Sequence, residues 1–241
     1  GRGLGQYGAQ GYAADHAWTS AQILDHFYGG TTAGQIPADA PVNPAAVRVD
    51  LRSQQGQSLR VSLAAGTILV RSTDGVDRWA HQGSVRLSVV GSGIRLETSS
   101  GCDGTWTEAF TTTEFSALDL VAAPSAGGPD GLMRVCYADG SSTWYPGYLR
   151  LSSNPIRTVN VVTIEDYLRG VVPSEVPAGW HPAALEAQAV AARSYAMAGD
   201  TRQLPYADTC DTILCQVYGG YFRNTAARGM AEVWQSWAVR L

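Results

Sequence analysis

The sequence predicts an α+β fold in which a β-rich region is followed by a region that contains helices. Three segments, 47–51, 59–63 and 85–89, alternate apolar and polar residues, which is the period of a half-buried strand. An alanine-rich stretch at 183–198 is instead typical of a helix. With 241 residues, 45% of them hydrophobic and 16% charged, the chain can bury the core of one large domain or two small ones.

Residues 1–33 are expected to form a glycine-rich segment and a short helix that pack on the region after residue 150. The first eight residues, with glycine at positions 1, 3, 5 and 8, are too rich in glycine for a stable helix. They suit a loop whose backbone lies close to another surface; a disordered terminus is the alternative. Thr19 or Ser20 can cap a helix over 21–28, and the two glycines that follow can end it. The apolar face of that helix is Ile23, Leu24 and Phe27.

The rest of the chain divides by composition. Residues 34–45 are rich in alanine and proline and are expected to be a linker, followed by a β-rich region at 46–150 and a helix-containing region at 151–241. In the last region, the segment 159–164 is a predicted strand. Pro173 and Pro177 predict an extended or turning segment. Pro182 suits the first turn of the alanine-rich helix, where its missing N–H removes no bond.

Composition argues against two kinds of interaction. The formal net charge of −4 offers no basic stripe to neutralise phosphates, so we expect no nucleic-acid partner. No apolar run approaches the roughly 20 residues of a membrane span, so we expect no spanning helix in this chain.

The four cysteines are an even number, which fits two disulfides and an oxidising compartment. Four free thiols and a zinc site are the alternatives, and the zinc site is the weaker one because no pair has Cys-x-x-Cys spacing. Cys102 and Cys136 flank a stretch rich in alanine, proline and glycine at 122–131. A bridge between them would close a long loop and restrict the unfolded chain.

Three blocks near the carboxyl end carry a family resemblance. They read EDYLRGVVPSEVP at 165–177, LEAQAVAARSY at 185–195 and CDTILCQVYGG at 210–220. In this order they resemble the SpoIID/LytB family, the group of sporulation stage II protein D and the amidase enhancers, over about 148–220. Segment 1–11, with 23–30, is similar to a family block that usually lies at the carboxyl end, so the block order looks permuted here. Residues 224–241 match nothing in the family, and the last region is therefore expected to be truncated.

The resemblance implies a secreted lytic transglycosylase that cleaves peptidoglycan glycan strands outside the cytoplasm. Its catalyst is the glutamate of a Ser-Glu-x-Pro motif, which is Glu175 here. One carboxylic acid suffices, because it protonates the glycosidic oxygen and then takes the proton of the C6 hydroxyl of muramic acid, which closes on C1. From the residues alone, an exposed loop glutamate is the alternative. The family also implies a second function, a non-catalytic amidase enhancer or glycan-binding module, with a cell-wall amidase as partner.

Six further residues are candidates for binding the sugar: Gln188, Arg193, Tyr195, Tyr218, Gln6 and Tyr7. The first two are conspicuous polar residues on the alanine-rich helix, where a solvated helix face is the alternative. The next two are tyrosines that can stack on sugar rings or belong to the core. The last two are the polar tips of the segment expected to lie beside the catalytic glutamate.

The resemblance also bears on the last two cysteines. Many relatives carry a histidine just before the second cysteine of the Cys-x-x-x-x-Cys block, and some bind zinc with it. This chain has Leu214 at that position. We therefore expect a short disulfide between Cys210 and Cys215 rather than a zinc site, and no cofactor.

Overall fold

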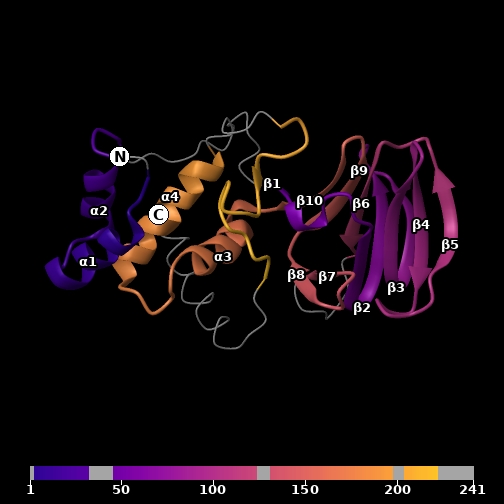
Figure 1. Cartoon of the computed structure of the whole chain (residues 1–241), viewed down its shortest axis with the longest axis horizontal. Helices are drawn as coiled ribbons and strands as arrows, with labels where there is room; N and C mark the ends of the chain where they lie inside the picture. Colours follow the sequence, from indigo (N-terminus) through magenta and orange to yellow (C-terminus); the bar gives the residue numbers. More distant parts are fainter. Residues whose placement is uncertain (1–2, 33–45, 124–130, 198–203, 222–241) are drawn as a thin grey trace. The chain divides into compact units, whose positions relative to one another are not determined.

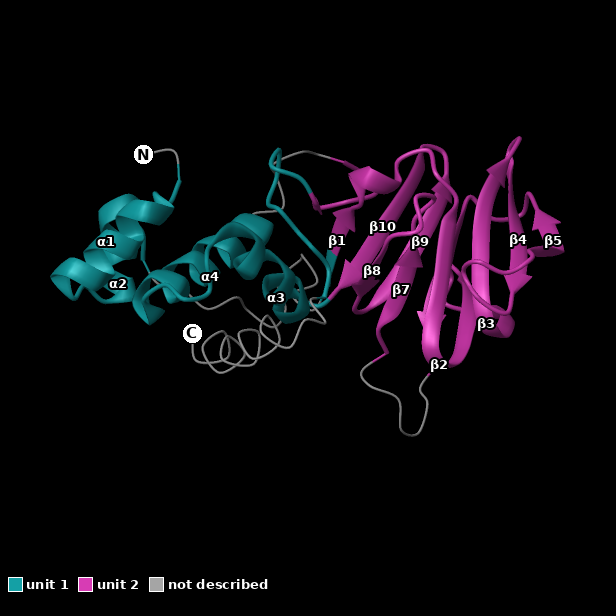
Figure 2. Cartoon of the chain, turned by 60° about the horizontal axis from the view of Figure 1, so that its bottom comes forward, with its two compact units in different colours: residues 1–47, 163–203, 212–241 teal, residues 48–162, 204–211 magenta. Residues whose placement is uncertain are grey.

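A computed structural model describes residues 3–32, 46–123, 131–197 and 204–221 of the chain (Figure 1). Within these residues it contains four α-helices and eleven strands, which confirms the mixed α+β class. The chain divides into two compact units (Figure 2). We call residues 1–47, 163–203 and 212–241 the helical unit, and residues 48–162 and 204–211 the sheet unit. The boundary between the β-rich and the helix-containing regions was expected near residue 150 and lies at 162–163 instead. The short segment 204–211 also belongs to the sheet unit.

One mixed sheet forms the sheet unit. Its strand order is β11-β1-β10-β9-β6-β2-β3-β4-β5, with β7 paired to β2 and β8 paired to β7. Strands β1 and β11 run parallel, whereas the pairs from β10 across to β5 are antiparallel. The strands are β1 (Val47–Asp50), β2 (Leu59–Ser72), β3 (Asp77–Val90), β4 (Gly93–Ser99), β5 (Thr107–Thr112), β6 (Ala117–Ala122), β7 (Met133–Cys136), β8 (Ser142–Tyr145), β9 (Tyr148–Ser153), β10 (Ile156–Val162) and β11 (Thr209–Cys210).

The four predicted strands are confirmed in β1, β2, β3 and β10, and two of them are longer than predicted. Strand β2 continues through the small residues 64–66 and changes partner on the way. Val61 lies opposite Val135 of β7, and Ile68 lies opposite Ala122 of β6, with a register shift between Ser62 and Thr67. This change of partner lets one strand contribute to the core on both parts of the sheet, where Val61 and Ile68 are fully buried.

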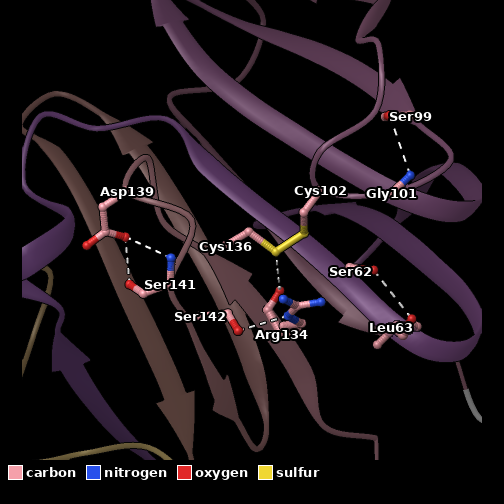
Figure 3. Close-up of a disulfide and its surroundings, with 10 residues drawn as sticks. All are labelled: Ser62, Leu63, Ser99, Gly101, Cys102, Arg134, Cys136, Asp139, Ser141 and Ser142. Carbon is pink, nitrogen blue, oxygen red and sulfur yellow. Dashed lines mark hydrogen bonds between the residues drawn. A yellow bond between two sulfur atoms is a disulfide. The ribbon is translucent and has the colours of Figure 1, made fainter.

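The cysteines are all bonded. Cys102 and Cys136 form a disulfide with a Cα–Cα distance of 6.1 Å, as the sequence predicted (Figure 3). Cys210 and Cys215 are also disulfide-bonded, and no cysteine is free among the described residues, which include all four. In the part of the chain that the structure describes, no helix is long and apolar enough to cross a membrane.

The helical unit begins with two short helices, α1 (Gln6–His16) and α2 (Ser20–Phe27), which both contact α4 (Pro182–Met197). The predicted cap of α2 is confirmed at Thr19, whose hydroxyl accepts from the backbone N–H of Gln22. The prediction that the first eight residues form no helix is wrong from Gln6 onward. Packing overrides the low helix propensity of glycine here, because Ala9 and Ala13 of α1 are buried with Ile23 of α2 in one cluster.

Helix α3 (Ile164–Glu175) corrects a second prediction, because it contains Pro173 where we expected an extended segment. A proline in the last turn removes one backbone donor only, the one that would bond the carbonyl of Arg169. The hydroxyl of Ser174 then donates to the carbonyl of Gly170 at 2.7 Å, and the N–H of Val176 donates to Val172 at 3.0 Å. The helix therefore continues to Glu175 and ends there. The predicted start of α4 at Pro182 is confirmed.

Candidate functional site

Glu175 is the last residue of α3, and both oxygens of its carboxylate are held by neutral donors. The backbone N–H of Val217 donates to Oε1 at 2.8 Å, and Nε2 of Gln6 donates to Oε2 at 3.0 Å. The three residues are far apart in the sequence, yet all lie in the helical unit. Two separate donors fix the plane of the carboxylate, so its orientation does not depend on the rotamer of Glu175 alone.

The Val217 donor is placed by a close contact between α3 and the segment that follows Cys215. Gly170 lies where an added Cβ would come within 2.5 Å of the ring of Tyr218 and within 2.6 Å of the carbonyl of Gly220. The backbone N–H of Gly219 donates to the carbonyl of Gly170 at 3.4 Å. One turn earlier on α3, the hydroxyl of Tyr167 donates to Gln216 at 3.1 Å. These contacts hold the Val217 backbone against the end of the helix.

The Gln6 donor is placed by the packing of α1 on α2. A Cβ added at Gly5 would meet the ring of Phe27 at 2.9 Å, and one added at Gly8 would meet it at 3.1 Å. Any larger residue at either position would force the ring of Phe27 to shift. The expectation that the amino-terminal glycines serve a close backbone approach is therefore confirmed for Gly5 and Gly8. The segment 3–32 is docked in the helical unit, with Gln6 directed at Glu175.

An aromatic pair joins α1 to the segment after α3. Tyr7 follows Gln6 on α1, is 83% exposed, and lies with its ring centroid 5.3 Å from that of the half-buried Trp180. Trp180 itself packs on a small apolar cluster that includes Val172 and Val176, the residues on either side of the end of α3. Tyr7 is therefore next in sequence to a donor of the site, and Trp180 packs against the end of the helix that carries Glu175.

The other predicted residues lie elsewhere in the helical unit. Arg193 on α4 forms an ion pair of 2.7 Å with Glu165 of α3, so it joins the two helices. Tyr195 is half-buried on α4. Tyr218 is 3% exposed beside Tyr167, with ring centroids 5.2 Å apart, and burial raises its pKa well above the ordinary value. A buried ring cannot stack on a sugar, so its placement fits the core alternative.

Gln188 is the remaining candidate, and its placement is unusual. The residue is 6% exposed on α4, and its Oε1 is buried without a hydrogen-bond partner in the described part of the chain. An unpartnered buried amide oxygen is costly. The structure gives no contact between Gln188 and Glu175, so the predicted role of Gln188 in holding the sugar or the catalytic glutamate stays a prediction.

Sequence reasoning missed the donors to Glu175 in part. The backbone N–H of Val217 carries no signal in the sequence, because any residue except proline offers the same group. Trp180 was expected to form an apolar pocket at the glutamate with Val172 and Val176, and these three residues do pack together, but the ring contact of Trp180 with Tyr7 was not predicted. Within the described ranges, no group of three or more His, Cys, Asp or Glu side chains is arranged to hold a metal ion.

The geometry defines what the site can do. It offers one carboxylate, held by two neutral donors and forming no ion pair within the described residues, and an exposed tyrosine, Tyr7, next in sequence to one of the donors. A single carboxyl group can give and take one proton in turn. Paired-carboxylate glycosidases need a second acid, and no second carboxylate contacts Glu175 among the described residues.

Comparison with known proteins finds one family and two relatives that match part of the chain. Residues 152–239 match the family described as SpoIID, stage II sporulation protein. Over 65 residues the chain is 48% identical to an uncharacterized protein of Brachyspira hyodysenteriae, covering 26% of this chain and 17% of that protein. It is 47% identical, again over 65 residues, to a protein of Bacillus subtilis named "Amidase enhancer", covering 27% of this chain and 8% of that protein. No solved structure matches.

These matches set two limits. The chain spans less than a fifth of the length of either relative. The family match reaches residue 239, so the expectation that 224–241 resembles nothing in the family is wrong. That segment lies outside the residues that the structure describes.

Proposed function

We propose that this chain, which belongs to the SpoIID family through residues 152–239, cleaves the glycan strands of bacterial peptidoglycan as a lytic transglycosylase. Glu175 is the single acid–base residue of this reaction. The supporting observation is the arrangement around its carboxylate, with one neutral donor on each oxygen and the exposed ring of Tyr7 next in sequence to one of these donors.

The reaction needs two proton transfers and no water. The protonated carboxyl of Glu175 donates its proton to the glycosidic oxygen as the bond from that oxygen to C1 of muramic acid breaks. The carboxylate that results takes the proton of the C6 hydroxyl, whose oxygen forms the new bond to C1. The products are a free sugar hydroxyl and a 1,6-anhydro-muramic end, and Glu175 is protonated again. Since the nucleophile belongs to the substrate, positioning replaces the capture of a water molecule.

The two donors to Glu175 have different roles in this scheme. The Val217 N–H is a backbone group fixed by the contact at Gly170, so it keeps Oε1 in place throughout. Gln6 is a side chain on the first turn of α1, and its amide can move with Oε2 and keep it oriented when a sugar oxygen arrives. Oε2 is therefore the oxygen that we assign to proton transfer.

A second function, of a different class, is a non-catalytic amidase enhancer or glycan-binding module. The similarity to the Bacillus subtilis protein named "Amidase enhancer" favours it. The exposed Tyr7 ring, which contacts the ring of Trp180, suits a binding role as well as a catalytic one, because aromatic faces stack on sugar rings. In this function, a cell-wall amidase is the partner and Glu175 only binds a sugar hydroxyl.

The place of action follows from the cysteines and the family. Two disulfides fit an oxidising compartment outside the cytoplasm, which is where peptidoglycan lies. We propose that the chain works there without a cofactor, and metal analysis of the purified protein tests this last point.

The test is digestion of purified peptidoglycan followed by mass spectrometry of the soluble products. The wild-type protein should release fragments with 1,6-anhydro ends, and Glu175→Gln should lower the rate about 10²- to 10⁴-fold, because it removes the only proton donor at constant size. Glu186→Gln on α4 is the matched control, since Glu186 makes no hydrogen bond or ion pair with described residues, and it should cleave normally. Anhydro ends formed at an unchanged rate by Glu175→Gln would exclude Glu175 as the catalyst. Glycan binding without any cleavage by the wild type would favour the amidase enhancer.

A further inference from the structure

The sheet unit contains a cavity of about 540 Å³ that the proposed reaction does not use. Three segments line it: the short 3₁₀ helix η1 (Arg52–Gln54) with the residues after it, the start of β2, and the turn between β7 and β8. The lining side chains that matter here are Gln54, Ser58, Arg60, Tyr137, Asp139 and Ser141. A cavity of this size accommodates a sugar unit, and most of its lining groups are polar.

Covalent and hydrogen bonds fix the walls of this cavity. Cys136, at the end of β7, is bonded to Cys102, and the turn that follows is closed by the N–H of Tyr137, which donates to the carbonyl of Ser141 at 2.9 Å. Oδ1 of Asp139 accepts from the N–H and the hydroxyl of Ser141, at 2.9 and 2.6 Å, as Figure 3 shows. The turn therefore presents its polar side chains in a defined arrangement before any ligand arrives.

Two of the lining groups lack partners within the described residues. Gln54 is only 4% exposed, yet its side-chain amide makes no hydrogen bond there. The amide atoms of Gln54 are not among the fully buried polar atoms that lack a partner, so they face the open space of the cavity. A ligand that enters the cavity can satisfy this amide, which offers one acceptor and two donors.

Arg60 is the second group. It lies directly opposite Arg86 in the β2–β3 register, and Arg86 is already bound to Glu97 through Nε at 2.6 Å. The Arg60 guanidinium makes no hydrogen bond or ion pair with a described residue. Like charges opposite each other on neighbouring strands destabilise a sheet. The charge of Arg60 acts on Glu97, but Glu97 is hydrogen-bonded to Arg86, so one carboxylate serves two arginines and the Arg60 guanidinium keeps its donors for the carboxylate of a ligand.

We propose that this cavity is a second glycan site, which binds an N-acetylated sugar that carries a carboxylate, as muramic acid does. Arg60 binds the carboxylate, the amide of Gln54 binds the acetamido group, and Ser141 and Asp139 bind ring hydroxyls beside the ring of Tyr137. This inference rests on the proposed function in one respect only, that the ligand is cell-wall glycan. A neutral sugar has no carboxylate for Arg60 to bind. The anionic oxygens of a polyphosphate would be repelled by the carboxylate of Asp139.

The experiment measures binding by calorimetry with the full chain carrying Glu175→Gln, so that no ligand is cleaved. The probes are glycan strands stripped of stem peptides, which carry the muramic carboxylate, and tri-N-acetylglucosamine, which does not. Adding Arg60→Gln should weaken binding of the stripped glycan about tenfold, the loss expected for one charge-assisted hydrogen bond, and leave binding of tri-N-acetylglucosamine unchanged. Arg71→Gln is the control: Arg71 is on the same strand, is paired with Asp77, and lies outside the cavity.

A second substitution separates ligand binding from folding. Gln54→Leu keeps the volume and removes the unpartnered amide, so stability should be unchanged or higher while affinity for the stripped glycan falls. Equal affinity of Arg60→Gln and its parent for stripped glycan would overturn the proposal, and so would binding that requires stem peptides. Failure of the proposed function looks different, because the wild type would then bind through Arg60 and release no anhydro ends.

Discussion

Glu175 of the helical unit differs from the buried acids of the sheet unit in the kind of partner that holds it. In the sheet unit, buried acids are matched by arginines: Asp119 accepts from Arg150 at 2.6 Å, and Glu97 accepts from Arg86 at 2.6 Å. In the helical unit, Glu175 accepts only from a backbone N–H and from a glutamine amide. The same contrast occurs within α3, whose first turn carries Glu165, paired with Arg193 at 2.7 Å.

This difference between the partners of the acids bears on which acid can transfer a proton. Hydrogen bonds from Arg86 lower the pKa of Glu97, so that acid stays ionised near neutral pH. An acid locked as a carboxylate in this way cannot donate a proton. The carboxylate of Glu175 is oriented by two uncharged donors and forms no ion pair with a described residue. The proposed function assigns proton transfer to this acid, and the arginine-paired acids of the sheet unit serve stability.

Deletion of residues 1–32 should have the largest effect on the contrast between Glu175 and the acids of the sheet unit. The deletion removes Gln6 from Glu175 and exposes the face of α4 that packs on Ile23, which is fully buried. We expect no detectable turnover, and a fall in the melting temperature of roughly 10 °C or more, because losing one such core side chain already costs about 2–5 kcal/mol. Calorimetry and the product assay measure the two effects. A deletion variant that melts at the wild-type temperature and remains active would show that the segment is dispensable.

The sequence predicted elements where a local signal is sufficient. The alternation of apolar and polar residues predicted the strands, Thr19 predicted the N-cap of α2, and Pro182 predicted the start of α4. Contacts between distant segments carried no such signal. Helix α1 contains glycines that its propensity disfavours, and it forms because those glycines admit the ring of Phe27. Strand β11 has two residues, too few for any pattern, and it is defined by its parallel partner β1.

The site divides in the same way. Glu175 was predicted from a motif and a family resemblance, and Gln6 from the expectation that glycines mark a close approach. The Val217 donor could not be predicted, because it is a backbone group positioned by the contact between Gly170 and Tyr218. Pro173 was misread because the rule that proline breaks helices is weakest in the last turn, where one donor is lost and the hydroxyl of Ser174 bonds a neighbouring carbonyl.

Removing an arginine from a buried ion pair of the sheet unit should have a smaller effect, on stability alone. Arg150→Gln leaves Asp119, which is 4% exposed, without its cation, and breaking a buried pair in this way costs about 3–5 kcal/mol. We expect a lower midpoint in denaturant unfolding, with the cleavage rate unchanged below the unfolding transition. Arg71→Gln, at an exposed pair, should cost less than about 1 kcal/mol. A large loss of cleavage by folded Arg150→Gln would mean that the charges of the sheet unit also serve the reaction.

The smallest effect tests the neutral donor itself. Gln6→Ala removes the hydrogen bond to Oε2 of Glu175 and leaves the bond from Val217 in place, so the carboxylate keeps one of its two anchors. We expect kcat for glycan cleavage to fall about tenfold, equivalent to about 1.4 kcal/mol, with little change in KM, because Gln6 orients the proton donor and does not bind the distant sugars. The matched control is Gln10→Ala, one turn further along α1, where Oε1 accepts from the backbone N–H of His181 at 2.7 Å. That substitution removes a comparable bond between α1 and the start of α4, so it should lower stability to the same degree while kcat stays normal. Equal losses of kcat in the two variants would mean that Gln6 acts only through the docking of α1, and that a second neutral donor on Glu175 contributes nothing to the reaction.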